Sequence, residues 1–550
     1  MGKRFTAYDL PLAIFLVSAV VGLLPAYDRS LSTKTLFFLL LGGLLYMAVS
    51  RLAKTRARWD AAAIGLAVVT VLVSVYFVTQ LGHMGFPEKI APLSHYADAI
   101  ARLTPNLSFW KPLGNTVGTF LEGGIFLLLG LALAERRAFP RTLLVIGLGF
   151  TALAVLLSAS RGAWLAVLGA GLLWASLSWK PARWIAVFIG AGLVGLVGYV
   201  LCCGEIRAVG ELPLVGGVLG PLFVRPDRLE VYYNSLTLIS DVPFTGIGLG
   251  GQFGMVYSRY ELLYHVPYLY NAHNLFLEIW LEQGLAGIFA WVWLAAAIFA
   301  AAYRWRVTSD PGARLRFEAS WIGLVAVLIH GLVDSCQAID PYTWLPFFTL
   351  LGLNAAMILG QQSQPEPGDR WLRYAPVGAA AAGLLLALAS AWPLPVALRS
   401  NQAALIQHRA ELSAQPGEAG ALEDKAVSLF QTVLEKDPAN RTANRRLGLI
   451  ALSRHEYDHA AQYLEAALAA DARHPGTRRA LGLAYAFSGK LEKAYPLLCG
   501  QLNIVDELKY WGWHYNANEN PQAGQNAYRT AELLEQAQPS CETPARPGGE

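Results

Sequence analysis

Long apolar runs separated by short polar connections dominate the first 398 residues of the chain. A run of about 20 apolar residues forms a helix that crosses the roughly 30 Å hydrocarbon core of a bilayer. The pattern therefore predicts an all-α, polytopic membrane domain of about 11 to 12 helices over residues 1–398. The expected spans are residues 11–27, 35–51, 61–79, 116–134, 142–159, 163–178, 185–202, 284–302, 319–337, 342–360 and 375–398.

From residue 399 to residue 550 no apolar run reaches membrane length, and an internal repeat appears between about residues 425 and 530. Leu447-Gly448 recurs as Leu481-Gly482, a step of 34 residues, and Gly512-x-x-Tyr515 begins an imperfect third copy. This period is that of tetratricopeptide repeats, which the tail resembles. An ordinary helical bundle is the alternative. The resemblance implies an α-helical solenoid that docks a peptide or protein.

Composition agrees with a membrane protein, since 55% of the residues are hydrophobic and only 15% are charged. The net charge of +4 gives no reason to expect a nucleic-acid partner. Basic clusters fall on alternate connections, so the positive-inside rule places the N-terminus in the cytoplasm. An odd number of spans then places the tail outside the cytoplasm, together with loops at about 80–115 and 203–283. Cys499 and Cys541 of the tail are either bridged or free thiols in that compartment.

Polar residues gather where the spans reach the outer surface, whereas the deep segments are nearly bare. Glu122 is the clearest exception. Transporters often keep ionisable groups at mid-membrane, so this distribution favours a site at the outer membrane boundary over a small-solute transporter. The outer polar residues are Asn115, Arg161, Arg225, Arg228, Asp241, Tyr257, Tyr260, Tyr264, His273, Asn274, Glu278, His330 and Asp334.

His273 lies in the stretch "NAHNLFLEIWLEQG", directly before a long apolar helix. Imidazole titrates near neutral pH and can accept a proton from an attacking alcohol, which makes His273 a candidate general base. In the alternative, His273 is structural, and Asn271 or Asn274 satisfies it as a helix cap. The sequence holds no HExxH motif or Cys-rich set, so we expect no metal site.

Three arginines are candidates for binding a phosphate, because a guanidinium offers a planar fork of donors. Arg161 lies in "SASRGAWLA", in a tight turn between two spans, and Arg225 and Arg228 lie in "VRPDRLEVYYNSL". In the alternative for Arg161, this residue is a membrane anchor. In the separate alternative for Arg225 and Arg228, the two residues belong to a solvated helix start.

The following loop contains a glycine-rich stretch and a row of tyrosines. "DVPFTGIGLGGQFG" at 241–254 lacks the spacing of a dinucleotide-binding loop, so its glycines indicate a tight bend. Tyr257, Tyr260, Tyr264 and Tyr268 recur at helical spacing and form one stripe. The stripe is either an interfacial anchor or a platform for sugar rings.

Four of these stretches together resemble the O-antigen ligase and O-antigen polymerase superfamily over roughly residues 100–360. They are "LGNTVGTFLEGG", "SASRGAWLA", the segment from "RPDRLEVYYNSL" through "GLGGQFG", and "NAHNLFLEIWLEQGLAGIFAW". The resemblance implies a bacterial inner-membrane enzyme that needs no metal or cofactor. The reaction would move a glycan from undecaprenyl pyrophosphate to an acceptor hydroxyl on a lipid, glycan or protein.

The resemblance also implies residue roles. His273 would be the general base or would orient the acceptor. Arg161 and Arg228, with Arg225 as a further candidate, would bind the pyrophosphate. Candidate glycan or acceptor contacts are Asn274, Tyr257, Tyr260, Tyr264 and Asn115. The superfamily usually has twelve spans with both ends inside, one span more than this pattern predicts.

Three alternatives remain open at this point. A polysaccharide polymerase of the same superfamily would use the same donor and the same site. A small-solute transporter is disfavoured by the nearly bare deep segments. A non-catalytic assembly scaffold built around the tail would have no need of His273, Arg161 and Arg228.

Overall fold

A computed structural model describes residues 5–84, 91–107, 109–203, 226–261, 269–305, 310–361, 394–413, 415–472, 474–501, 503–518 and 520–536. These residues form helices and no β-strand. The chain divides into two compact units, each treated by itself below. The membrane unit comprises residues 1–233, 248–251 and 271–376, and the tail unit comprises residues 234–247, 252–270 and 377–550.

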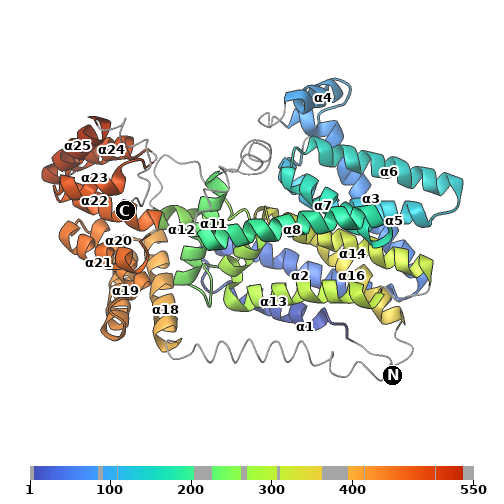
Figure 1. Ribbon diagram of the computed structural model, residues 1–550, viewed down its shortest axis with the longest axis horizontal. Helices are drawn as coiled ribbons and strands as arrows, with labels where there is room; N and C mark the ends of the chain where they lie inside the picture. The colour runs from blue at the N-terminus through green and yellow to red at the C-terminus, as the bar shows by residue number, and fades with distance from the viewer. Residues whose placement is uncertain are drawn as a thin grey trace. The chain divides into compact units, whose positions relative to one another are not determined.

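The membrane unit confirms an all-α polytopic fold. Within the described residues, six helices are long and apolar enough to cross a membrane. Each expected span up to 342–360 falls on a described helix, whereas residues 375–393 of the last span lie outside the described residues. The helices, shown in Figure 1, are α1 (Asp9–Val21), α2 (Arg29–Leu52), α3 (Arg56–Gln80), α4 (Ala91–Ala101), α5 (Gly114–Ala134), α6 (Ala138–Leu157), α7 (Arg161–Ser178), α8 (Lys180–Cys203), the first half of α11 (Pro226–Asp241), α13 (Leu275–Trp305), α14 (Pro311–Gly331), α15 (Cys336–Ile339) and α16 (Trp344–Gln361), with short 3₁₀ turns η1 (Leu81–His83) and η3 (Pro341–Thr343).

Glycines let the helices of the membrane unit approach closely. A Cβ atom on Gly130 of α5 would lie 2.3 Å from the Cβ of Ala319 on α14. On α2, a Cβ on Gly42 would lie 2.1 Å from the ring of Phe348 on α16. Small residues at such crossings are what membrane helices use to pack, because lipid provides no hydrophobic drive for their association.

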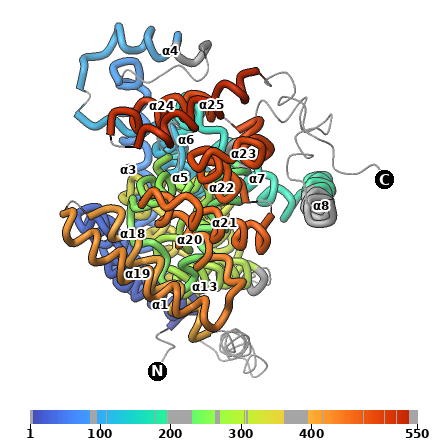
Figure 2. Tube along the Cα trace, turned by 90° about the vertical axis from the view of Figure 1, so that its left-hand side faces the viewer, coloured from blue at the N-terminus to red at the C-terminus, as the bar shows by residue number. Residues whose placement is uncertain are grey.

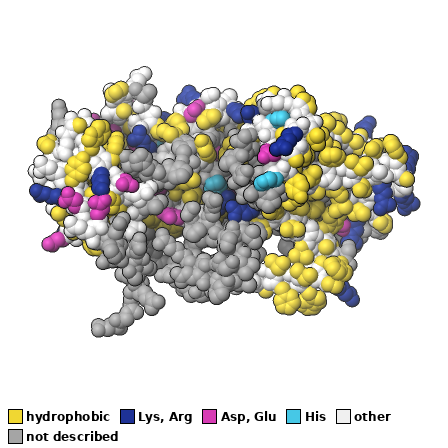
Figure 3. Space-filling view, turned by 90° about the horizontal axis from the view of Figure 1, so that it is seen from above, with side chains coloured by type: hydrophobic (Ala, Val, Ile, Leu, Met, Phe, Trp, Pro, Cys, Tyr) yellow, Lys and Arg dark blue, Asp and Glu magenta, His cyan; other side chains and the backbone are white. Residues whose placement is uncertain are grey.

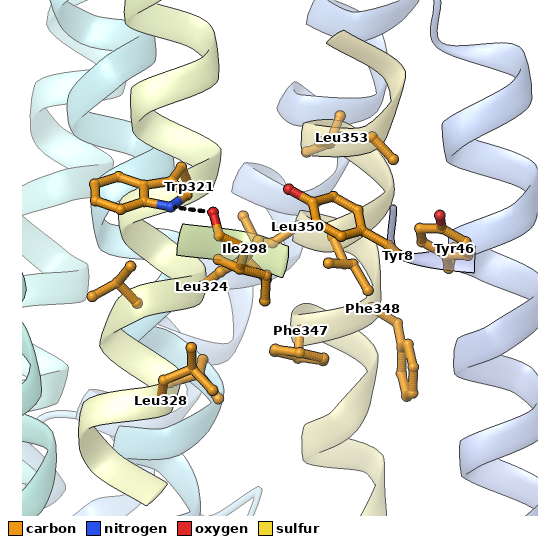
Figure 4. Close-up of a cluster of buried hydrophobic side chains, with 14 of the residues drawn as sticks. Tyr8, Tyr46, Ile298, Trp321, Leu324, Leu328, Phe347, Phe348, Leu350 and Leu353 are labelled. Atoms are coloured by element: carbon orange, nitrogen blue, oxygen red, sulfur yellow. Dashed lines mark hydrogen bonds between the residues drawn. The ribbon is translucent and has the colours of Figure 1, made fainter. Parts of the chain in front are cut away.

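Aromatic and branched side chains fill the space between these helices. Figure 4 shows Phe347 and Leu350 on the side of α16 toward α14, and Phe348 on the opposite side of α16. The indole of Trp321 donates a hydrogen bond of 3.0 Å to the carbonyl oxygen of Ile298, so α14 is also tied to α13. This bond gives the buried indole N–H of Trp321 an acceptor inside the core.

Basic connections lie together at one end of the membrane unit. There the guanidinium of Arg316, at the start of α14, lies 2.7 Å from the carboxylate of Asp60, at the start of α3. The end of α16 is also here, since a Cβ on Gly360 would lie 2.9 Å from the carbonyl oxygen of Lys54. In Figure 3 apolar side chains cover much of the surface on the right, and Lys and Arg gather at its far edge.

The tail unit is a series of antiparallel helix pairs. Gly448 lies against the side chain of Leu464 in one pair, and Gly482 lies against Leu498 in the next, 34 residues further on. Gly512 and Tyr528 make the same contact in a third pair. Figure 2 shows these hairpins in orange to red; the helices of the unit are α12 (Phe253–Tyr260), α18 (Leu394–Leu412), α19 (Pro416–Lys436), α20 (Arg441–Ser453), α21 (Tyr457–Ala470), α22 (Pro475–Phe487), α23 (Leu491–Leu498), α24 (Ile504–Ala517) and α25 (Pro521–Gln536).

The sequence predicted a single boundary between the two domains, at residues 398 and 399. Instead, residues 234–247 and 252–270 of the expected outer loop belong to the tail unit. The reason is a buried ionic cluster. Asp241 accepts hydrogen bonds from Arg441 at 2.6 Å, Arg446 at 2.8 Å and Thr442 at 2.8 Å, all from α20. These four residues are called the Asp241 cluster below. The guanidinium of Arg445 also lies 3.7 Å from the ring centre of Tyr260.

Several helix ends differ from the expected spans, among them one end each of α13 and α14. α13 begins at Leu275, well before residue 284, and Gly284 interrupts it with φ 66°. α14 ends at Gly331 instead of residue 337. The glycine-rich stretch bends as expected, because Gly248 has φ 115° and a Cβ there would lie 2.5 Å from the backbone of Ala26.

Candidate functional site

The candidate site is built around residues 332–335, which follow the end of α14 and are called the 332–335 turn here. A helix end leaves backbone carbonyls without partners inside the helix. Asn274 donates to the carbonyl oxygen of Leu332 at 2.9 Å, and Arg228 donates to that of Val333 at 2.7 Å. The turn thereby joins side chains that are far apart in the sequence.

His273 lies at the start of α13 in a left-handed backbone conformation, with φ 51°. Its backbone is held from two sides: its N–H donates to Asn271 at 3.3 Å, and its carbonyl oxygen accepts from the hydroxyl of Tyr232 at 2.8 Å. Asn274 caps α13, since its side-chain oxygen accepts from the N–H groups of Phe276 and Leu277. The backbone conformation at residue 273 is therefore fixed by contacts on both sides.

Asp334 is the partner of the His273 ring. Nδ1 of His273 lies 3.4 Å from Oδ1 of Asp334, whose side chain is 4% exposed while that of His273 is 28% exposed. Asn115 donates to Oδ2 of Asp334 at 2.7 Å, and the N–H of Ser335 donates to Oδ1 at 2.8 Å. The carboxylate is therefore fixed by three groups, and the His273 ring contacts it through Nδ1.

The charge of Asp334 is stabilised by its surroundings. Burial raises the pKa of the Asp334 carboxyl. The hydrogen bond with His273 and the charges of His330, His273 and Arg228 lower this pKa by more, so that it lies well below its usual range. Burial, with the negative charge of Asp334, raises the pKa of Tyr232 to about 12 against the opposing charge of Arg228. Tyr232 is thus a neutral donor to His273, and Asp334 an anion.

Arg228 and Arg161 approach the same turn from two helices. Arg228 lies in the first turn of α11 and bonds Val333 directly. Arg161 is the first residue of α7, and a Cβ on the adjoining Gly162 would lie 2.6 Å from the ring of His330 and 3.2 Å from Val333. The N-terminus of α7 also carries the positive end of its helix dipole, which adds to the charge of Arg161.

The other predicted residues divide into three groups. Asn115 and Asn274 belong to the site through their bonds to Asp334 and Leu332. Tyr257 and Tyr260 of α12 are in the tail unit and are only 2% exposed, so they do not form the exposed platform for sugar rings that was one of the two interpretations of the stripe. Their burial follows from Phe253 stacking on Tyr257 and from the arginines on Tyr260. Arg225, Tyr264 and Tyr268 lie outside the described residues.

The structure ties three further residues to this site: two of them stood among the outer polar residues without a specific role, and Tyr232 was not among those residues. They are Asp334, Tyr232 and Glu278; the last accepts from the N–H of Ala272 at 2.7 Å. Glu122, Glu278 and Glu282 are all buried, so the membrane helices hold more carboxylates than the nearly bare pattern suggested. A signal existed for Asp334, because an aspartate directly after an apolar run needs a partner.

The arrangement suits proton transfer beside a phosphate. A carboxylate that holds one imidazole nitrogen leaves the other nitrogen to take a proton from a hydroxyl group. The guanidinium of Arg228 and the positive N-terminal end of α7, which begins at Arg161, would stabilise the negative charge of a departing phosphate. Among the described residues, no cluster of three or more His, Cys, Asp and Glu side chains is placed to hold a metal ion.

Comparison with known proteins points to the same segment of the chain. The family model described as O-antigen ligase matches residues 146–292, which include Arg161, Arg228 and His273. An O-antigen ligase from Salmonella typhimurium (strain LT2) is 28% identical over 239 residues, which is 42% of this chain and 55% of that protein. The chain thus spans about half the length of this curated relative.

Proposed function

We propose that the protein is a membrane glycan transferase of the O-antigen ligase type. It moves a glycan from an undecaprenyl-pyrophosphate carrier to an acceptor hydroxyl at the outer face of the bacterial inner membrane. The observation that carries this proposal is the His273–Asp334 pair next to Arg228 and the N-terminal turn of α7. The match of residues 146–292 to the O-antigen ligase family supports the same reaction class.

In the proposed step, Nε2 of His273 accepts the proton of the acceptor hydroxyl while its Nδ1–H donates to Asp334. The acceptor oxygen bonds to the anomeric carbon, and the bond from that carbon to the pyrophosphate oxygen breaks. The pyrophosphate leaves with the electron pair, and Arg161 and Arg228 neutralise its charge. Attack from the face opposite the leaving group inverts the anomeric carbon. No metal ion or cofactor takes part in the proposed step.

The two ends of the membrane unit support the proposed side of the membrane. The basic connections lie at one end, and the starts of α5, α7 and α13 with the end of α14 form the other. The positive-inside rule assigns the basic end to the cytoplasm, so the site faces outward. Cys499 of the tail takes part in a disulfide, which fits a tail in the oxidising compartment outside.

The tail is proposed to be a tetratricopeptide array that docks a protein or peptide partner. Its support is the recurring glycine contact, at Gly448 with Leu464 and at Gly482 with Leu498, in successive helix pairs. The step of 34 residues equals the period of that repeat. A protein acceptor or a partner of the envelope assembly would fit such a surface.

The test supplies the purified full-length protein in nanodiscs with an undecaprenyl-pyrophosphate-linked glycan and candidate acceptors. We expect undecaprenyl pyrophosphate to be released only when an acceptor is present, at the same rate with and without a chelator. The anomeric configuration of the product, read by NMR, should be inverted. A folded sample that releases none with any acceptor, but takes up a solute in proteoliposomes, would show a transporter instead.

The second candidate function is polymerisation by the same site. The product separates the two, because a ligase adds the glycan once whereas a polymerase yields a ladder of lengths. A ladder that remains attached to the carrier lipid would assign the protein to the polymerases.

A further inference from the structure

α5 carries a line of polar side chains from the site into the buried interior of the membrane unit. Asn115, Thr119 and Glu122 are spaced so that they lie on one face of the helix. Asn115 bonds Asp334 at the outer end of this line. Thr119 donates to the carbonyl oxygen of Asn115 at 2.9 Å and lies 3.4 Å from Nδ1 of His330. The line is therefore continuous from the site to His330.

The line ends in an ionisable pair inside the bundle. Oε2 of Glu122 lies 2.7 Å from Nδ1 of His330, and the two side chains are 0% and 2% exposed. Oε1 of Glu122 and Nε2 of His330 are buried and have no hydrogen-bond partner in the described part of the chain. Burying such a pair costs free energy that apolar residues of similar volume would avoid, so stability alone does not account for it.

His330 also shapes the turn that carries Asp334. Its carbonyl oxygen accepts from the N–H of Val333 at 2.9 Å and from the N–H of Asp334 at 3.0 Å. Gly162, at the start of α7, packs against the imidazole ring. Glu122 therefore holds a residue whose backbone closes the 332–335 turn from one side, while Asn115 holds Asp334 from the other.

We infer that Glu122 and His330 form a buried positioning pair for the proposed transfer reaction. Through Asn115 on α5 and through the backbone of His330, the pair fixes Asp334 and thereby the ring of His273. This inference rests on the proposed function. Both side chains are buried inside the bundle, so we expect the pair to act on the rate of the chemical step and not on donor binding.

The first variant is Glu122→Gln, which keeps the size of the side chain and removes its charge. We expect kcat to fall by about 10²-fold, the cost of misplacing a catalytic group by about 1 Å, with KM for the donor unchanged. Thr119→Val removes only the hydroxyl between the pair and Asn115 and should lower kcat in the same direction. Wild-type kcat in both variants, or a loss seen only as a higher KM, would overturn the inference.

A second comparison tests whether the pair acts through Asp334. In an Asp334→Asn background, Glu122→Gln should cause no further loss, because residues that act as a unit are not additive. A further loss of the same size would show an independent role. Asn354→Ala is the matched control: it removes another buried polar contact, the 2.7 Å bond from Tyr8, and should lower thermal stability with kcat unchanged.

Hydrogen exchange gives a readout that does not depend on activity. Glu122→Gln should speed exchange at the amides of residues 332–335, whereas Asn354→Ala should not. If the wild-type protein transfers no glycan, the proposed function fails, and exchange still decides whether the pair orders the turn. If wild type is active and both exchange and kcat are unchanged in Glu122→Gln, only the present inference fails.

Discussion

At the scale of single residues, His273 has a backbone requirement and a side-chain requirement that can be separated. A non-glycine residue at φ 51° is strained, although Asn tolerates this conformation better than Ala. We expect His273→Asn and His273→Ala each to lower kcat by roughly 10²–10⁴-fold, because both lack the base. His273→Ala should also lose about 1 kcal/mol of stability. Activity kept by Asn and lost by Ala would show that the backbone shape, not the imidazole, is required.

Asp241 is a second residue whose surroundings lead to a testable prediction, here on the pH dependence of stability. Burial raises the pKa of the Asp241 carboxyl. The charges of Arg441, Arg446 and Arg445 lower this pKa by more, so that it lies well below its usual range. A lowered pKa means that the ionised form stabilises the fold above about pH 4, the value in an unfolded chain, and that this contribution is lost as the pH falls further.

We therefore expect acid to destabilise the tail unit below about pH 4, and Asp241→Asn to remove most of that dependence. At neutral pH the variant should lose about 3–5 kcal/mol, because it leaves buried guanidiniums without their counter-charge. Hydrogen exchange of α20 amides at pH 7 and at lower pH measures both effects. An equal acid response in the variant and the wild type would assign the dependence to other carboxyls.

At the scale of elements, apolar run length predicts where membrane helices lie but not where they end. The end of α14 at Gly331 depends on Asn274 and Arg228, which bind the carbonyls of Leu332 and Val333 from other helices. His273 could be chosen from its sequence neighbours, whereas its partner Asp334 is 61 residues away in the chain. The helical spacing of Tyr257 and Tyr260 predicts that they share one face of a helix. It does not predict that arginines distant in the sequence cover Tyr260.

The glycines of the tail helices give a prediction at the same scale. Gly482→Ala would place its Cβ 2.5 Å from a methyl group of Leu498, which is itself fully buried. We expect a loss of about 1–3 kcal/mol from this overpacking. Gly420→Ala in α19 meets no atom within 4 Å and should instead stabilise that helix by up to about 1 kcal/mol. Exchange rates of amides in α22 and α19 distinguish the two, and similar effects at both positions would argue against the repeat packing.

At the scale of the whole molecule, one helix contributes residues to both units. α11 is one helix, with Arg228 and Tyr232 in the membrane unit and Asp241 in the tail unit. A tail truncation that removes α20 also removes Arg441, Thr442 and Arg446, the bonding partners of Asp241. Removing the tail therefore has two separate consequences, loss of the docking surface and loss of the Asp241 cluster.

Two truncations separate these consequences. Deleting residues 405–550 should lower transfer strongly, because the second half of α11 loses its buried counter-charges and no longer steadies the half that carries Arg228. Deleting residues 503–550 removes α24 and α25 but keeps the Asp241 cluster, and should leave the transfer rate to a small acceptor unchanged. Rates are compared for samples with equal insertion. Full activity in the longer deletion would show that α11 keeps its place without the tail, and loss in the shorter deletion would place α24 or α25 in the reaction itself.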